Sequence, residues 1–294
     1  MELRLLKYFA TVAEELHFSR AAARLNMAQP SLSQQIRHLE DELGVALLVR
    51  DKRNVALTEP GRLFLASARE ILTQVDRSVL QVRRAGRGEV GQIDIGMVGT
   101  AIYEDILLRA LGAHREHHPE VAIVLHEMST GEQLAALREG RIQIGFLRPP
   151  VKDPRIALTT VLREPLVAVL PSTHRLAARE CIPLSALAED SFIMWPRNHG
   201  LGLLELVLGA CEKAGFTPQI AQEAKEVQTI LGLVAAGFGV SIMPQMVCKM
   251  RQSGLTYCPL TRPDLLIEIA AAYGSGKASP LLTQFLATLR IALA

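Results

Sequence analysis

The fold of the amino-terminal region is decided by residues 18–44, which read FSRAAARLNMAQPSLSQQIRHLEDELG. Ser19 precedes an alanine-rich run and suits the N-cap of a short helix over residues 20–25. Pro30 favours the first turn of a second helix because its φ is fixed near the helical value, and Gly44 ends that helix. One face of the second helix is apolar at helical spacing, with Leu32, Ile36, Leu39 and Leu43. Two short helices joined by a tight turn predict a helix-turn-helix.

The outward face of residues 29–44 carries amides, hydroxyls and an arginine, which are the groups that match base edges in the major groove of DNA. We expect DNA contacts from Gln29, Pro30, Ser31, Ser33, Gln34 and Arg37. For any single one of these residues, a solvated position on an amphipathic helix is the alternative. Apolar runs at residues 45–50 and 55–58 flank a basic turn and predict a β-hairpin wing. Lys52 and Arg53 at its tip are placed to reach phosphates or the minor groove.

Residues 1–72 resemble the LysR-type transcriptional regulators without a gap. The resemblance rests on FSRAA (18–22), AQPSLS (28–33), LE (39–40), LG (43–44), LLVR (47–50), LT (57–58) and Gly61. Within the family, the wing segment LVRDKR (48–53) is most similar to regulators of aromatic-acid catabolism. The resemblance implies a homodimer or homotetramer that binds duplex DNA, responds to a small molecule and contacts RNA polymerase.

A long helix is expected after the wing, with Thr58 as its cap and Pro60 in its first turn. Its apolar residues repeat about every 3.5 positions: Phe64, Leu65, Ala68, Ile71, Leu72, Val75, Val79 and Val82. This stripe predicts pairing with a second copy of the helix, so that two recognition helices read an inverted repeat; packing on its own DNA-binding domain is the alternative. Glycines at 86, 88 and 91 mark a hinge. We therefore expect a DNA-binding domain at 1–58, a linker at 59–91 and an effector domain at 92–294.

From residue 92, short apolar runs alternate with amphipathic stretches, which is typical of an α/β fold with mainly parallel strands. A capping box is expected at residues 130–133, with Thr130 as the cap. Expected strands cover residues 92–97, 121–127, 142–147, 166–170, 192–195, 219–223, 240–243 and 266–272. Residues 127–141 and 226–244 resemble the effector-binding domain of the same family. That resemblance implies two Rossmann-like lobes, similar to periplasmic binding proteins, with lobe I at 92–162 and 267–294 and lobe II at 163–266.

A cleft at strand carboxyl ends and helix amino termini suits a small anion. The expected effector-binding residues are Thr100, Thr130, Phe146, Arg148, Pro196, Arg197, Asn198, His199 and Gln228. Arg148 and Arg197 are the expected cations for an effector carboxylate, such as a small organic acid. The alternatives are that each threonine is a helix cap, that each arginine is solvated and that Trp195 belongs to the core.

Other function classes find little support in the sequence. The formal net charge is +2, and residues 1–90 hold 14 Lys and Arg against 11 Asp and Glu, a mild excess that suits a polyanion. The apolar stretch 229–244 contains three glycines, so we expect no membrane span and a cytoplasmic protein. His114, His117 and His118 lack further ligands for a metal, and the chain has no catalytic motif, so we expect neither an enzyme nor a cofactor. Cys181, Cys211, Cys248 and Cys258 leave a cysteine-based redox sensor as the alternative regulator.

Overall fold

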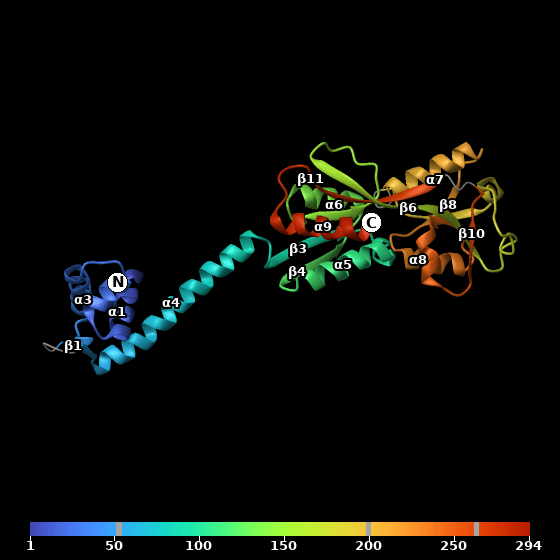
Figure 1. The fold of residues 1–294 in the computed structure, drawn as a ribbon. Coiled ribbons are helices and arrows are strands. Elements are labelled where there is room, and N and C mark those ends of the chain that lie inside the picture. The colour runs from blue at the N-terminus through green and yellow to red at the C-terminus, as the bar shows by residue number, and fades with distance from the viewer. Residues whose placement is uncertain (51–54, 198–200, 262–264) are drawn as a thin grey trace. The chain divides into compact units, whose positions relative to one another are not determined.

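The structure is a computed structural model that describes residues 1–50, 55–197, 201–261 and 265–294. The chain divides into two compact units, Met1–Arg84 and Ala85–Ala294, which are described separately below (Figure 1). Within the described ranges, no helix is both long enough and apolar enough to cross a membrane.

The first unit is a three-helix domain with a hairpin. Its helices are α1 (Leu3–Glu15), α2 (Phe18–Arg24) and α3 (Gln29–Leu43), and their packed apolar side chains form one core around Phe9, Leu32 and Ile36. Strands β1 (Leu48–Arg50) and β2 (Val55–Leu57) pair antiparallel as the expected wing. The helix-turn-helix and the end of α3 at Gly44 are confirmed.

The expected cap of α2 is wrong. The helix begins at Phe18, and the side chain of His17 accepts the backbone N–H of Arg20 at 3.4 Å, so Ser19 lies inside the first turn. An imidazole nitrogen takes the place of the hydroxyl oxygen that usually caps a helix. The sequence did not indicate this because histidine is not a favoured capping residue.

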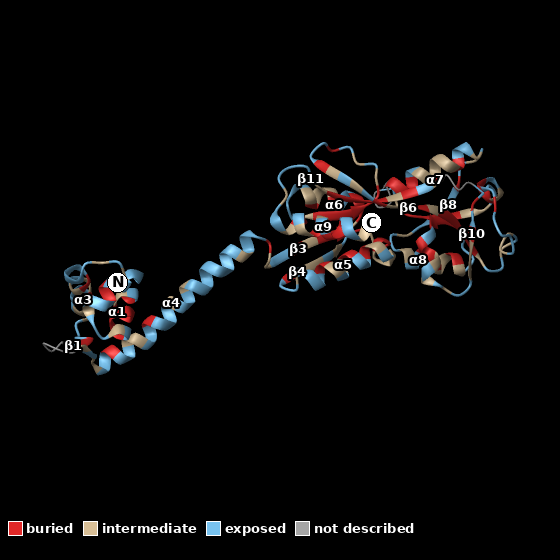
Figure 2. Cartoon of the chain, in the orientation of Figure 1, coloured by how far each residue is buried: buried red, intermediate tan, exposed pale blue. Residues whose placement is uncertain are grey.

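Helix α4 (Glu59–Gly86) packs on the three-helix domain through its amino-terminal part. The Thr58 hydroxyl accepts the Gly61 N–H at 2.9 Å, which confirms the expected cap. Phe64 packs on Phe9 with ring centroids 5.3 Å apart, and Ala68 is buried. Beyond Ala68 the surface of α4 is mostly exposed, apolar side chains included: Val82 is 72% exposed (Figure 2).

The second unit has two large apolar cores and a small cluster of Leu147, Ile156 and Ala272. The first includes Ile93, Phe146 and Phe285, and the second includes Phe192, Val207 and Ile242. We use lobe I for the part around the first core and lobe II for the part around the second. The helices of lobe I are α5 (Asp105–His117), α6 (Thr130–Arg138) and α9 (Pro280–Leu293), and those of lobe II are α7 (Leu201–Lys213) and α8 (Val227–Ala235). Short 3₁₀ helices cover Ala101–Tyr103, Leu184–Leu187 and Gln245–Met250.

The main sheet is mixed, which corrects the expectation of mainly parallel strands. Strands β3 (Gly91–Met97), β4 (Val121–Glu127) and β5 (Ile144–Leu147) run parallel, but β11 (Leu266–Gly274) pairs antiparallel with β5 and with β6 (Ile156–Pro171). Strands β9 (Ser241–Pro244) and β10 (Leu255–Pro259) also pair antiparallel with β6. Strands β7 (Ser191–Met194) and β8 (Gln219–Glu223) form a separate parallel pair.

Strand β6 belongs to both lobes. It pairs with β11 over residues 156–165 and then with β9 and β10 over residues 166–171. The sequence predicted only residues 166–170 as a strand, because charged Arg163 and Glu164 interrupt the apolar run before them. Backbone pairing with β11 holds this polar part in the sheet despite its composition.

The capping box lies one residue earlier than expected. Ser129 is the N-cap of α6, and the Glu132 carboxylate accepts the Ser129 backbone N–H at 2.7 Å. Thr130 is therefore the first helical residue, and its hydroxyl is not used as a cap. This shift leaves Thr130 available at the amino end of α6.

We expect Gly61→Ala to destabilise the first unit. A methyl group at Gly61 would collide with the backbone carbonyl of Leu47, and relief of such overpacking costs about 1–3 kcal/mol. Urea unfolding followed by far-UV circular dichroism measures the loss. The chain's one tryptophan, Trp195, reports on the second unit, so its fluorescence transition should not move. Gly86→Ala is the control, since nothing lies within 4 Å of its added methyl group; an equal loss in both variants would contradict the packing argument.

Candidate functional site

The exposed face of α3 presents unpaired polar groups. Gln29, Pro30, Ser31, Gln34 and Arg37 are exposed and Ser33 is half-buried, while Leu32, Ile36 and Leu39 on the opposite face are buried. The Ala28 cap provides no side-chain hydrogen bond, so the amino end of α3 keeps backbone N–H groups for an outside acceptor. This face has the groups expected of a recognition helix. Lys52 and Arg53 lie outside the described residues.

Glu40 holds the wing against α3. Its Oε1 accepts the backbone N–H groups of Leu47 and Leu48 at 2.9 and 3.0 Å. The carboxylate therefore fixes the approach to β1 relative to the recognition helix. This role of Glu40 was not predicted from the sequence, because a lone acidic residue on a helix is usually solvated.

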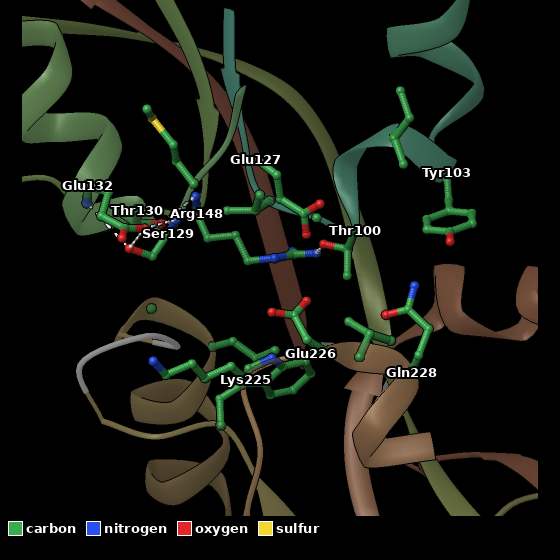
Figure 3. Close-up of a pocket in the computed structure, with 18 residues that line it drawn as sticks. Thr100, Tyr103, Glu127, Ser129, Thr130, Glu132, Arg148, Lys225, Glu226 and Gln228 are labelled. Carbon is green, nitrogen blue, oxygen red and sulfur yellow. Dashed lines mark hydrogen bonds between the residues drawn. The ribbon is translucent and has the colours of Figure 1, made fainter. Parts of the chain in front are cut away.

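The second unit contains a pocket of about 480 Å³ between its two lobes. Residues from the carboxyl ends of β3, β4 and β5 line one side, and residues around the amino ends of α7 and α8 line the other (Figure 3). Its polar and charged lining residues are Thr100, Tyr103, Glu127, Ser129, Thr130, Glu132, Arg148, Lys225, Glu226 and Gln228. The volume lies within the range of small-molecule sites.

Arg148 is the most deeply buried charge in this pocket. Its side chain is 7% exposed, and its Nη2 donates to the Thr100 hydroxyl at 3.1 Å and to the Glu164 carboxylate at 3.3 Å. Its Nη1 is buried and, among the described residues, has no hydrogen-bond partner. A buried guanidinium nitrogen without an acceptor carries a desolvation cost that an anionic ligand would remove.

Both predicted threonines point a hydroxyl group at Arg148. Thr100 accepts from the guanidinium, and the Thr130 hydroxyl accepts the Arg148 backbone N–H at 3.3 Å. Thr100 is the N-cap residue of the 3₁₀ helix Ala101–Tyr103, but its hydroxyl makes no capping hydrogen bond, and Thr130 lies inside α6. Because each hydroxyl oxygen already accepts a hydrogen bond, its proton remains available to a ligand oxygen.

Carboxylates behind Arg148 balance its charge. Burial lowers the pKa of Arg148, and the carboxylates of Glu164 and Glu104 oppose that shift. The second oxygen of Glu164 accepts the Met246 N–H at 2.8 Å. Burial and repulsion from Glu164 raise the pKa of Glu104, whereas Lys249, 3.9 Å away, opposes the rise. Lys249 also donates to the Tyr103 carbonyl at 3.0 Å, so the cluster links the lobes beneath the pocket.

The other predicted pocket residues divide into three groups. Gln228 lines the pocket, as does Trp195, which is also part of the lobe II core. Phe146 does not line it, because its side chain is fully buried in the lobe I core near Phe285. Pro196 and the exposed Arg197 are absent from the described lining, and Asn198 and His199 lie outside the described residues.

Several lining residues were missed by the sequence analysis, above all the charged residues Glu127, Lys225 and Glu226. Glu127 ends β4 and Glu226 precedes α8, and these are the positions that place a side chain at the pocket. The same reasoning that selected Thr100 and Gln228 applies to them. Because an anionic ligand was expected, cationic and hydroxyl side chains were predicted to bind it, and the carboxylates were not.

The comparisons with known proteins match both units. Residues 3–62 match the model described as "Bacterial regulatory helix-turn-helix protein, lysR family", and residues 86–294 match the LysR substrate binding domain. This chain belongs to the LysR family of DNA-binding transcriptional regulators. Its members are regulators and not enzymes, and the fold is the expected helix-turn-helix followed by a two-lobed α/β domain.

Named relatives agree with this assignment. The chain is 41% identical over 286 residues to the transcriptional regulator AlsR of Bacillus subtilis, which covers 97% of this chain and 94% of AlsR. Its fold is similar to that of full-length CbnR complexed with target DNA, with a TM-score of 0.81, 31% identity and all of both chains covered. The second unit is similar to the BenM effector binding domain with its effector benzoate, with a TM-score of 0.62 and 31% identity over 68% of this chain and 91% of that chain.

His114 and Cys211 are buried residues of the lobe cores. His114 is fully buried, packs on His118 and Phe285, and lies 3.5 Å from the Thr288 hydroxyl. In the part of the chain that the structure describes, no group of three metal-ligating side chains meets. All four cysteines are free, and burial raises the pKa of Cys211 to about 11, which makes its thiol unreactive.

The second unit should lose stability in mild acid through His114. Burial, with repulsion from His118 and His117, lowers the pKa of His114 to about 4, so below pH 6.5 the unfolded chain binds a proton that the folded chain does not. From pH 7 to pH 5 the loss in unfolding free energy is about 2 kcal/mol. Urea unfolding followed by Trp195 fluorescence measures it. His114→Leu should reduce this dependence and the exposed His38→Leu should not; an unchanged slope in His114→Leu would refute the assignment.

Proposed function

We propose that this regulator binds an inverted-repeat operator as a dimer or a dimer of dimers, and that a small carboxylate in the pocket of the second unit changes its DNA-bound form. The buried, unpartnered Nη1 of Arg148 carries the effector part of the proposal. In this proposal residues 1–58 bind DNA, residues 59–91 couple the copies, and residues 92–294 bind the effector, with lobe I at 92–162 and 267–294 and lobe II at 163–266. RNA polymerase is the proposed further partner, and the cytoplasm, where bacterial DNA lies, the proposed location.

The exposed stripe on α4 supports the dimer. Ile71, Val79 and Val82 are 40%, 44% and 72% exposed, although a helix of 28 residues with apolar residues at this spacing normally buries them against a partner. Pairing two α4 helices would set two recognition helices on a two-fold axis. A mass of one chain by light scattering at micromolar concentration would contradict the dimer.

We propose that α3 contacts base edges and that the wing contacts phosphates. Gln34→Ala removes an amide suited to a base edge, so binding to the specific operator should weaken by about 1–3 kcal/mol with little change in non-specific binding. Arg53→Ala in the expected wing should weaken both specific and non-specific DNA binding and should make the affinity less dependent on salt concentration. Fluorescence anisotropy with operator and scrambled duplexes, over a salt series, measures this.

Gln74→Ala, an exposed amide on α4, serves as the control and should bind both duplexes as the unmodified protein does. Equal losses on operator and scrambled DNA for Gln34→Ala would remove its proposed role in reading sequence. The operator for this experiment is the DNA beside the protein's own gene. Absence of salt-sensitive binding to that DNA would count against the DNA-binding proposal as a whole.

Three donors on one side of the pocket support a carboxylate effector. Arg148 Nη1 and the hydroxyl protons of Thr100 and Thr130 are all available, and a carboxylate has enough acceptor sites for them. The ends of the parallel strands and the amino end of α6 favour the same charge. Closure of the lobes around the ligand would then shift the population of DNA-bound forms.

A thermal-shift screen of small aromatic and aliphatic carboxylates, benzoate included, tests the effector site. A carboxylate that binds only the folded chain at 100 times its Kd stabilises it by about 2.7 kcal/mol and raises its melting temperature. Thr100→Val and Arg148→Met should each reduce the shift, and Thr283→Val, an exposed hydroxyl on α9, should not. An undiminished shift in both pocket variants would place the carboxylate elsewhere.

A further inference from the structure

The pocket holds two carboxylates that have no partner. Glu127 at the end of β4 belongs to lobe I, and Glu226 just before α8 belongs to lobe II. Both side chains are exposed, and within the described residues neither forms a hydrogen bond or an ion pair. Figure 3 shows Glu127 and Arg148 on one side of the pocket and Glu226 facing them from the other side. An anion held by Arg148 would therefore lie near two further negative charges.

The remaining charges of the lining do not offset these two. The Glu132 carboxylate already accepts the N–H and hydroxyl of Ser129, each at 2.7 Å, and Arg148 is paired with Glu164. Lys225 contributes one positive charge, for which the described residues provide no ion pair. With Arg148 balanced by Glu164, the other charged residues of the described lining sum to −2, three carboxylates (Glu127, Glu132 and Glu226) against Lys225. A ligand whose charge is wholly negative gains from Arg148 but is repelled by the rest of the pocket.

We infer that the effector is an amino carboxylate: its carboxylate binds at Arg148, Thr100 and Thr130, and its ammonium or other cationic nitrogen faces Glu127 and Glu226. This inference rests on the proposed effector site and specifies the chemical class of ligand. An ammonium has three donors and no acceptor, which suits two carboxylates that lack donors. Two independent observations carry the inference, the unpartnered buried nitrogen of Arg148 and the unpartnered pair of carboxylates.

The two carboxylates also link ligand charge to lobe closure. Glu127 and Glu226 belong to different lobes, so a cation between them attracts both and draws the lobes together. Without the cation they repel each other and oppose closure. An amino carboxylate therefore stabilises the closed form through both of its charged ends, and a simple carboxylate through one.

Isothermal titration of the full chain with matched ligand pairs tests the inference. Each pair is an amino carboxylate and the same skeleton without the amine: phenylalanine and 3-phenylpropanoate, leucine and 4-methylpentanoate, 4-aminobutanoate and butanoate, aspartate and succinate. We expect the amino member of the best-binding pair to bind at least tenfold more tightly, a difference of about 1.4 kcal/mol. Succinate, with two negative charges, should bind more weakly than aspartate.

Isosteric variants connect that preference to the two carboxylates. Glu127→Gln and Glu226→Gln each remove one charge from an exposed side chain, so both should fold, and each should lower the amino preference by at least threefold. The double variant should abolish it. Glu116→Gln on α5 is the matched control, since Glu116 is exposed and lies outside the pocket lining.

The possible results separate the two levels of the proposal. If carboxylates bind, lose affinity in Arg148→Met, and show no preference for the amine, the amino carboxylate is wrong and the carboxylate site stands. A preference that survives in the double variant Glu127→Gln/Glu226→Gln also overturns the inference. If no ligand of the panel binds, or if Arg148→Met leaves every affinity unchanged, the proposed effector site fails and the inference fails with it.

Discussion

The second unit is organised around one buried charge, the guanidinium of Arg148. A side chain that is 7% exposed cannot keep a positive charge unless the protein supplies acceptors, and Glu164 and Thr100 do so. The nearby carboxylate of Glu104 adds an opposite charge without a hydrogen bond to Arg148. These partners come from different elements: Thr100 follows β3, Arg148 follows β5, and Glu164 lies within β6. These partners keep the guanidinium charged, and the guanidinium in turn holds their side chains in place. The nitrogen left without an acceptor then defines where the pocket can bind an anion.

The connection between the lobes is formed by ordinary secondary structure. Strand β6 runs unbroken from the β11 pairing of lobe I to the β9 and β10 pairings of lobe II, and it carries Glu164 in the part that pairs with β11, next to the start of that second set of pairings. A hydrogen bond from Lys249 of lobe II to the Tyr103 carbonyl of lobe I also joins the lobes. The lobes thus share a covalent and hydrogen-bonded base beneath the pocket, while Glu127 and Glu226 on its two walls form no hydrogen bond or ion pair with the described residues. Such a base permits the walls to move without unfolding either lobe.

The first unit shows how a small domain keeps a reading face free. Its apolar core is complete with α1, α2, α3 and the first turns of α4, so the polar face of α3 is not needed for stability. Glu40 uses its carboxylate to fix the segment leading into β1, which lets the domain orient a wing without a large core. The rest of α4 differs from this domain, because several of its apolar side chains are exposed in a single chain.

The sequence by itself determined the helix-turn-helix, the long helix capped by Thr58, and Thr100, Thr130, Arg148 and Gln228 as residues of the pocket, since periodicity, capping and strand ends are local properties of a chain. Only the tertiary structure decided the antiparallel course of β6 and β11, the burial of Phe146 away from the pocket, and the shift of the α6 cap to Ser129. Strand direction depends on partners far along the chain, and a side chain after a strand points into a core or a cleft according to what packs on it. For the same reason, the sequence indicated a cation for an anion, but only the tertiary structure placed the carboxylates of Glu127 and Glu226 on opposite sides of one pocket.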